Sequence, residues 1–390
     1  MSSTTNHNRA DQAMEAEIEE LPPLRSRPIA ASLILMFGTV ALVFGIALSV
    51  SFGAVHMSLS TVWSAVFAFN PDITHHQIIQ EIRLPRVLAS ALVGAAFAVA
   101  GALMQGITRN PMADSGILGL NAGAALVLAL CFALVPGLSY NMILLLCFIG
   151  ASIGAVIVFG ISAVSRGGFT PVRLVLAGSA VSSLLYALSE GIALHFKIGQ
   201  DLAFWFAGGV ANVKWEQLKT ITPWVIVAIL AAIVISRSIT LLSLGEEIAI
   251  NLGQRTQLIR VIAVVIIVIL AGSSVSVVGA VSFVGLIVPH ITRYLVGVDY
   301  RWIIPCSAIL GGLLVVLADL GARMINPPYE FPIGALIAML GVPFFLYLAR
   351  NERRGSSGYD ESVWYRGASS EAQYASAFHS RSSYHYHFHY

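Results

Sequence analysis

The sequence predicts an all-α membrane protein that crosses the bilayer about ten times, with both termini in the cytoplasm. Two features of the composition support this fold class. Of the 390 residues, 57% are hydrophobic and only 11% are charged, whereas soluble domains carry roughly 25% charged residues. The apolar residues also form uncharged runs of about 20 residues or more, the length that a helix needs to cross the hydrocarbon core.

The N-terminal half contains five predicted spans. They follow a polar tail, 1–28, which lacks the apolar region and cleavage site of a signal peptide, so the first apolar run is expected to be retained as a helix. The uncharged stretch 115–165 is too long for one helix, and Pro136-Gly137 divides it. The five spans are 29–54, 86–107, the two parts of 115–165, and 172–189.

The C-terminal half of the chain contains five more predicted spans. The stretch 261–292 is expected to hold two segments, divided near Gly272-Ser273-Ser274. The spans are 221–236, the two parts of 261–292, 302–320 and 332–349. Residues 29–350 are therefore predicted to form one ten-helix domain, followed by a disordered cytoplasmic tail, 351–390.

The distribution of lysine and arginine orients these spans, because short cytoplasmic loops carry an excess of positive charge. With the N-terminus inside, and leaving out the distal tails, thirteen arginines are cytoplasmic: Arg25, Arg27, Arg109, Arg166, Arg173, Arg237, Arg255, Arg260, Arg293, Arg301, Arg350, Arg353 and Arg354. Only six positive residues are then external: Arg83, Arg86, Lys197, Lys214, Lys219 and Arg323. The opposite orientation would reverse the bias.

Two of the external arginines flank a proline at the start of a span. Pro85 suits the first turn of a helix, so Arg83 and Arg86 are expected at the positive end of the helix dipole, where a cation is disfavoured by roughly 0.3–1 kcal/mol. Binding of lipid headgroups is one explanation. The other is an outward basic patch that receives carboxylates from a partner protein.

Four motifs resemble the permeases of iron-siderophore and cobalamin ABC importers. They are RLPRVLASALVGAAFAVAGALMQGITRNPMADSGILGLNAGA (83–124), LLSLGEEIAINLG (241–253), GAVSFVGLIVPHITR (279–293) and PIGALIAMLGVPFFLYL (332–348). The motifs occur in order, and the resemblance covers roughly residues 30–350. It implies a ten-helix bundle in the bacterial cytoplasmic membrane, in agreement with the number of spans.

The resemblance also assigns a docking site. In that family, arginines of the RLPR segment and one before the last helix meet glutamates of the substrate-binding protein. The matching residues are Arg83, Arg86 and, in ADLGAR, Arg323.

The segment 241–253 is too polar to span the membrane, and it is expected to form a short amphipathic helix. Its apolar residues recur every four positions, and glycines allow sharp entry and exit. A helix lying on the membrane surface is one explanation; the resemblance implies instead a coupling helix that docks into an ATPase subunit. The residues concerned are Leu244, Gly245, Glu246, Glu247, Ile248, Leu252 and Gly253.

Other polar residues within the spans give weaker indications. Ser179, Ser182 and Ser183 could line a translocation pathway, although hydroxyls bonded to their own backbone explain them equally well. Glu190 and Asp319 are expected near span ends, where water can reach them. Small residues in span 86–107 and in Gly150-Ala-Ser-Ile-Gly154 are expected to allow close helix packing.

Catalytic and cofactor motifs are missing from the sequence. There is no GxxxxGK[ST] for ATP phosphates and no HExxH, and the three cysteines lie in apolar runs without CxxC spacing. The alternating histidines of the last residues could bind a metal, but a tail without a dedicated function is the simpler interpretation. We therefore expect a non-catalytic chain with no cofactor or metal of its own and no nucleic-acid partner.

Together these features predict a permease subunit that takes up a ferric siderophore by ATP-driven alternating access. Its expected partners are two ATPase subunits that hydrolyse the ATP, a substrate-binding protein, a second permease chain (identical or related) and membrane lipid. Cobalamin or haem is the alternative substrate. A secondary transporter driven by an ion gradient is the rival, but it would need paired intramembrane carboxylates or interrupted helices, and the sequence shows neither clearly.

Overall fold

The computed structural model describes residues 26–53, 57–164, 171–211, 213–279, 281–325, 331–347 and 350. The predicted C-terminal tail and most of the N-terminal tail lie outside these residues. The chain divides into two compact units, Met1–Ala338 and Met339–Tyr390, and all sites discussed below belong to the first. Within the described residues every regular element is a helix, apart from one isolated bridge between Ser26 and Gly297.

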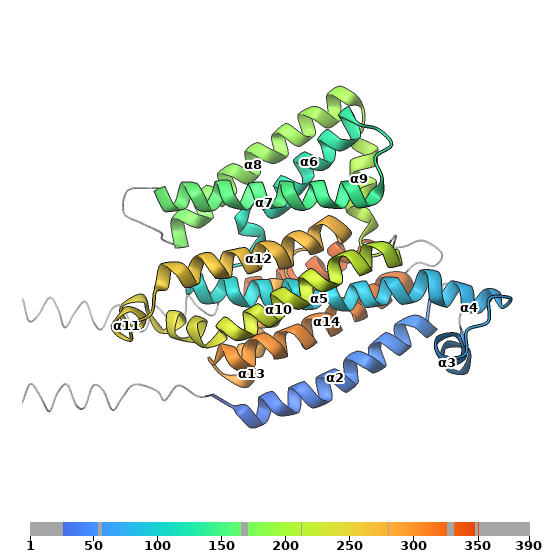
Figure 1. Ribbon diagram of the computed structural model, residues 1–390, viewed down its shortest axis with the longest axis horizontal. Coiled ribbons are helices and arrows are strands. Elements are labelled where there is room, and N and C mark those ends of the chain that lie inside the picture. Colours follow the sequence, from blue (N-terminus) through green and yellow to red (C-terminus); the bar gives the residue numbers. More distant parts are fainter. Residues whose placement is uncertain are drawn as a thin grey trace, which may run out of the picture. The chain divides into compact units, whose positions relative to one another are not determined.

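Seven helical segments of the described residues are long and apolar enough to cross a membrane. In chain order (Figure 1) they are α2 (Pro28–Ser51), Thr74–Thr108, α7 (Tyr140–Val164), α8 (Pro171–Phe196), α10 (Trp215–Leu244), α12 (Thr256–Val278) and α14 (Tyr300–Met324). Three shorter apolar helices are α6 (Leu120–Leu134), α13 (Val284–Val296) and Ile333–Tyr347. Each predicted span corresponds to one of these helices, and membrane crossing by the three short ones stays a prediction.

Short helices connect the long ones. The segment Thr74–Thr108 joins α4 (Thr74–Ile78), the π-helical turn η1 (Ile79–Arg83) and α5 (Leu84–Thr108). The other short elements are α3 (Leu59–Phe67), the 3₁₀ turn η2 (Ser115–Leu118), α9 (Gly199–Gly208) and α11 (Glu246–Asn251). Figure 1 shows α3 and α4 at one end of the bundle and α11 at the opposite end.

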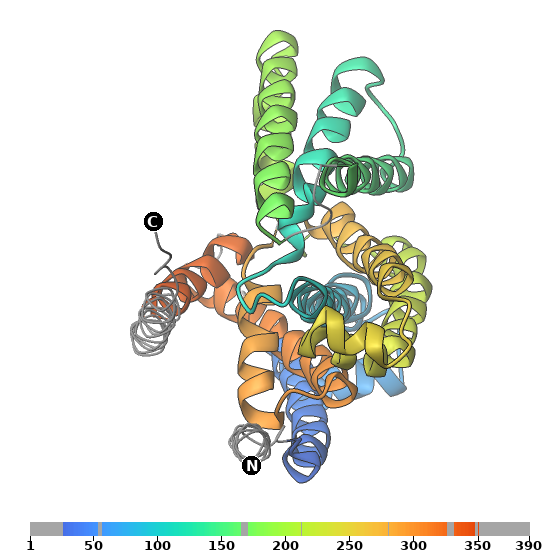
Figure 2. The ribbon, with the colours of Figure 1, turned by 90° about the vertical axis from the view of Figure 1, so that its left-hand side faces the viewer.

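Helix α5 is the centre of the bundle, packed against α10, α12, α13 and α14 (Figure 2). Small residues permit this packing. A Cβ on Gly94 would lie 2.2 Å from the carbonyl oxygen of Gly311 in α14, and one on Gly101 would lie 2.0 Å from that of Gly285 in α13. In lipid the hydrophobic effect does not drive helices together, so van der Waals packing at such close backbone contacts stabilises their association. The predicted packing role is confirmed.

Helices α6, α7 and α8 form a second group, packed against one another (Figures 1 and 2). A Cβ on Gly123 of α6 would lie 2.2 Å from the carbonyl oxygen of Gly150 in α7, which confirms the small-residue pattern predicted for that helix. The break between α6 and α7 occurs at Pro136-Gly137, as predicted, with Gly137 at φ 90°.

The predicted division of 261–292 is wrong. Helix α12 passes through Gly272-Ser273-Ser274 without interruption and ends at Val278. Serine hydroxyls are satisfied inside the helix, since Ser274 Oγ donates to the carbonyl of Leu270 (2.8 Å). The chain turns instead between Gly279 and Phe283, which both have φ above +70°.

Candidate functional site

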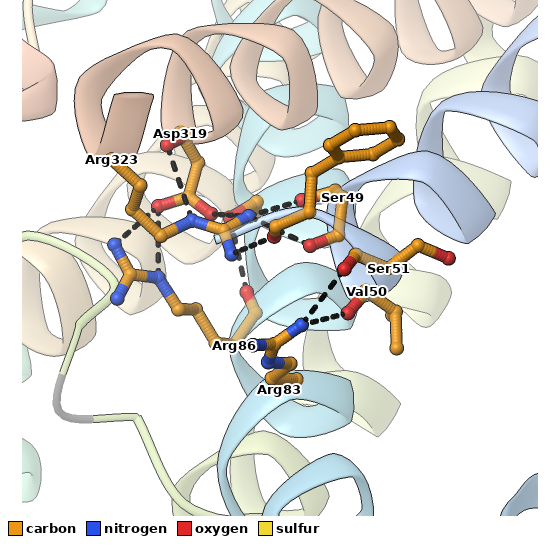
Figure 3. Close-up of polar contacts among 9 residues, drawn as sticks. Ser49, Val50, Ser51, Arg83, Arg86, Asp319 and Arg323 are labelled. Carbon is orange, nitrogen blue, oxygen red and sulfur yellow. Dashed lines mark hydrogen bonds and ion pairs between the residues drawn. The ribbon is translucent and has the colours of Figure 1, made fainter. Parts of the chain in front are cut away.

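Two arginines that are 240 positions apart in the sequence, Arg83 and Arg323, meet at the end of α2. Arg83 Nη1 donates to the carbonyl of Ser51 (3.1 Å) and also to that of Val50. Arg323 donates to the carbonyls of Ser49 (3.0 Å) and Phe52 (3.1 Å). The last carbonyls of a helix have no partner within the helix and carry partial negative charge, so the two guanidinium groups cap α2 (Figure 3).

Asp319 of α14 supplies the negative charge of this cluster. Its Oδ1 accepts from Nε (2.9 Å) and Nη2 (2.7 Å) of Arg86, and its Oδ2 lies 3.0 Å from Nη2 of Arg323, one turn further along α14. Figure 3 shows the carboxylate between the two guanidinium groups. Asp319 is fully buried, so the expectation that water reaches it is wrong.

The structure brings Arg83, Arg86 and Arg323 together, but not as an exposed patch. Their exposed fractions are only 7%, 6% and 8%. Pro85 lies in the first turn of α5, as predicted, and Arg83 is at its N-cap position. The helical segment nevertheless continues back through η1 and α4 to Thr74, so the arginines are not at a free positive helix end. Sequence reasoning missed Asp319 as their partner; the one local signal was its position four residues before Arg323.

The predicted coupling segment forms the short helix α11, bounded by glycines that have positive φ. Gly245 adopts φ 143° and Gly253 φ 77°, conformations that favour glycine. Leu244 is the last residue of α10, not part of α11. The expected single face of Leu244, Ile248 and Leu252 is therefore wrong, because the turn at Gly245 separates the first from the others.

Helix α11 nevertheless presents apolar side chains at its surface. Ile248, Ile250 and Leu252 are 49%, 54% and 63% exposed, and sequence reasoning had missed Ile250. Glu247 is exposed, while Glu246 is bonded within the chain: Nη2 of Arg260 lies 2.8 Å from its Oε2. This hydrogen bond is the main reason why the pKa of Glu246 is below its ordinary value. Both glutamates were expected to face an ATPase subunit; this stays a prediction, and of the two only Glu247 is exposed without the Arg260 bond that Glu246 makes.

Of the three serines of α8, one has its hydroxyl bonded to the backbone of the same helix. Ser179 is exposed and donates to the carbonyl of Leu176 (3.1 Å), the alternative that the sequence left open. Ser183 is exposed, and Ser182 is half-buried. Their role in a pathway stays a prediction.

In the described part of the chain, no group of three or more His, Cys, Asp or Glu could hold a metal ion. The C-terminal histidines lie outside the described residues.

Comparison with known proteins identifies the family. Residues 41–351 match the family model described as the FecCD transport family. The chain belongs to this family. It is therefore a multi-pass transport permease of the membrane, in agreement with the apolar helices of the structure.

Relatives of this FecCD chain align over most of their length. It is 51% identical over 330 residues to the iron(3+)-hydroxamate import system permease protein FhuB of Bacillus subtilis (85% of this chain, 86% of the relative). It is 43% identical over 326 residues to the iron-uptake system permease protein FeuB of the same organism (84% and 98%). A solved inward-facing putative metal-chelate type ABC transporter superposes with a TM-score of 0.72 at 28% identity, covering 82% of this chain and 99% of that one.

Proposed function

We propose that this chain is the permease subunit of an ABC importer that takes up ferric siderophores of the hydroxamate class. The similarity to a hydroxamate permease supports the substrate class. The protein itself is not expected to be an enzyme; ATP would be bound and hydrolysed by two partner subunits. A second permease chain completes the pathway, and a substrate-binding protein delivers the chelate from outside a bacterial cytoplasmic membrane.

The observation that carries this mechanism is the exposed apolar surface of α11. Ile248 and Ile250 of this short helix, and Leu252 directly after it, are exposed between two glycine turns at one end of the bundle. An exposed apolar patch with a charged neighbour is typical of a protein interface. We propose that this surface is the coupling helix, and that movement of an ATPase subunit is transmitted through it to α10 and α12, which flank it in the chain.

The opposite end is the proposed docking site for the binding protein. Among the described residues the cluster gathers three arginines, Arg83, Arg86 and Arg323, around one carboxylate, Asp319. Buried charge still acts at a distance and attracts an acidic partner. We propose that the cluster both fixes α2 to α5 and α14 and directs carboxylates of the binding protein to this end. The contribution of Ser179, Ser182 and Ser183 to the pathway is part of the same proposal.

Reconstitution tests the coupling assignment. The permease is purified with its ATPase subunit, its partner permease and its binding protein, and vanadate-sensitive uptake of a labelled ferric hydroxamate is measured in proteoliposomes. Ile248→Ser and Leu252→Ser are expected to reduce ATPase co-purification and to uncouple hydrolysis from uptake. The exposed polar residue of the same helix provides the matched control, Asn251→Ala, which should behave as wild type. Wild-type coupling in both serine variants would refute the assignment.

The same vesicles test the substrate. Ferric hydroxamate should be taken up in preference to haem and cobalamin, and an ionophore that collapses ion gradients should not stop uptake. Preference for haem or cobalamin would replace the substrate assignment and leave the ABC mechanism intact. Uptake that needs an ion gradient but no ATP would refute the mechanism as a whole.

A further inference from the structure

Two further arginines, Arg109 and Arg293, line a pocket at the α11 end of the bundle. The pocket has a volume of 190 Å³, and it lies between the end of α5, the end of α10, α13 and the start of α14. Its polar lining consists of Gln105, Arg109, Ser243, Arg293 and Tyr300; the remaining lining residues are Pro111, Leu244 and Val298. Neither the coupling surface nor the docking cluster uses this pocket.

Arg293 is fixed inside the pocket by neutral partners. Its Nη2 donates to Oε1 of Gln105 (3.1 Å) and to the hydroxyl of Tyr300 (3.0 Å). Gln105 and Tyr300 are both only about 2% exposed. Gln105 is itself held by the carbonyls of Gly285 and Leu286. This arrangement orients the guanidinium group and leaves its Nε and Nη1 donors, together with the hydroxyl proton of Tyr300, without acceptors among the described residues.

No carboxylate among the described residues pairs with either pocket arginine. Elsewhere in the same part of the chain, Arg86, Arg260 and Arg301 each lie within 3 Å of a carboxylate oxygen. The side chain of Arg109 makes no ion pair or hydrogen bond within the described residues, and it affects Glu246 only through a longer-range interaction. Partly buried positive charge is costly unless it is compensated, and Arg293 is partly buried. Together with the exposed Arg109 beside it, this arginine indicates an anion from outside the chain.

The depth of the pocket indicates what kind of anion. Its residues lie at the ends of three of the helical segments that are long enough to cross a membrane, at Thr108, Leu244 and Tyr300, where the hydrocarbon core gives way to headgroups. The residue next to Arg293, Tyr294, is 81% exposed, and exposed tyrosines are enriched at this interface. Phosphate groups of lipids are the anions concentrated at that depth, and basic pockets between transmembrane helices bind them.

We propose that the pocket of Arg109, Arg293 and Tyr300 binds a phosphate group, supplied by the headgroup of an anionic phospholipid. The planar guanidinium of Arg293 suits the phosphate oxygens, and the hydroxyl of Tyr300 donates a further hydrogen bond. Arg109, exposed at the mouth of the pocket, adds the second positive charge. A bound headgroup would join α5, α13 and α14 beside the coupling helix.

Native mass spectrometry of the delipidated full-length protein, titrated with phosphatidylglycerol, tests the proposal. Arg293→Gln should weaken binding about tenfold, or about 1.4 kcal/mol, and Arg293→Lys less, because lysine keeps the charge. Since Arg293 has structural partners, Arg109→Asn is the second variant; Asn tolerates the left-handed backbone of Arg109 (φ 52°), so it removes the charge without strain. Arg255→Gln, an exposed arginine outside the pocket, is the matched control and should bind as wild type.

Inorganic phosphate, used alone, separates the two sources of the ligand. If Arg293→Gln weakens the binding of millimolar phosphate but not that of phosphatidylglycerol, the pocket binds an anion as proposed, but its ligand is free phosphate and not a lipid headgroup. Equal binding of both probes by Arg293→Gln, Arg109→Asn and Arg255→Gln would overturn the proposal. Normal lipid and phosphate binding by Arg293→Gln, combined with loss of the ATPase subunit, would also overturn it and assign the pocket to a carboxylate of that subunit.

Discussion

Asp319 carries the only negative charge described in the cluster that holds α2, α5 and α14 together. It is fully buried, and it contacts two guanidinium groups that are themselves more than nine-tenths buried. Removing one partner of a buried ion pair destabilises the protein by much more than the intact pair stabilises it, because the remaining charge stays buried without a counter-charge. The carboxylate is therefore expected to be more important for stability than any one of the arginines.

Asp319→Asn should lower the free energy of unfolding by roughly 3–5 kcal/mol, since the buried arginines lose their counter-charge. Thermal unfolding of the purified protein in detergent measures the change. Glu190→Gln is the control, because Glu190 is an exposed carboxylate on α8. Equal melting temperatures for the two variants would show that the cluster does not depend on the charge of Asp319.

The ion pair between Glu246 and Arg260 makes the stability around α11 dependent on pH. The hydrogen bond from Arg260 holds the pKa of Glu246 below its ordinary value of 4.5, against the opposing effect of partial burial. A carboxyl whose pKa is lower in the folded state stabilises that state above the unfolded value. Its contribution is lost as the pH falls below 4.5 and through the folded pKa.

Glu246→Gln should therefore reduce stability at pH 7 and have no effect at a pH below the folded pKa. The difference should be at most about 1 kcal/mol, because solvent screens a carboxylate that is one-third exposed. Denaturation measured as a function of pH tests this. In an Arg260→Gln background the same substitution should leave the pH profile unchanged; a persistent difference there would mean that another group is the partner.

At the scale of helices, the closest contacts are made by glycine backbones and not by large side chains. At Gly101 the carbonyl oxygen of Gly285 occupies the space that a side chain would need. The Cα of Gly285 is only 2.4 Å from the position that a Cβ on Gly101 would take. Backbone cannot move away as a flexible side chain does. Any substitution here must separate α5 from α13.

Gly101→Ala is expected to destabilise the protein by roughly 1–3 kcal/mol, the usual cost of overpacking. Gly191→Ala, on α8, is the matched control because a Cβ there would meet nothing within 4 Å, and removing a helical glycine should stabilise by up to about 1 kcal/mol. Both are measured by thermal unfolding. Similar effects of the two substitutions would contradict the close approach of α5 to α13.

Element boundaries could be predicted where local chemistry determines them. Pro136-Gly137 ends a helix because proline lacks an N–H and Gly137 takes a positive φ. Gly272-Ser273-Ser274 looks like a similar break, yet α12 continues through it, because hydroxyls bond to the helix backbone and neighbouring helices cover the small residues. Small residues in a membrane helix thus indicate packing as readily as a turn.

At the scale of the whole molecule, the orientation in the membrane still rests on the distribution of arginine and lysine. The structure offers a direct test, because the three native cysteines are at most 5% exposed and should give little background labelling. Asp72 and Leu252 are exposed at opposite ends of the bundle, next to α4 and α11 respectively.

Asp72→Cys should react with a membrane-impermeant maleimide in intact cells, and Leu252→Cys only after the cells are permeabilised. The reason is that α11 is predicted to face the cytoplasm and α3 and α4 the exterior. Labelling is read by the mass shift of the purified chain, with the wild-type protein as the background control. The reverse pattern would invert the orientation, and with it the proposed docking and coupling ends.

The sequence by itself determined the membrane class, the approximate spans and the glycine turns of the coupling segment. Each of these depends on local properties: the length of an apolar run, the lack of charge within it, and the conformational freedom of glycine. The resemblance to known permeases likewise rests on contiguous motifs, and the match to residues 41–351 confirmed it.

Only the tertiary structure decided what the charged residues do. Arg86 and its carboxylate are 233 positions apart, and Arg293 is 188 positions from the glutamine that orients it. No local pattern predicts such pairs, because they form only when helices from the two halves of the chain pack together. Packing turned a predicted exposed patch into a buried cluster, and it left the two arginines at the opposite end without a carboxylate among the described residues.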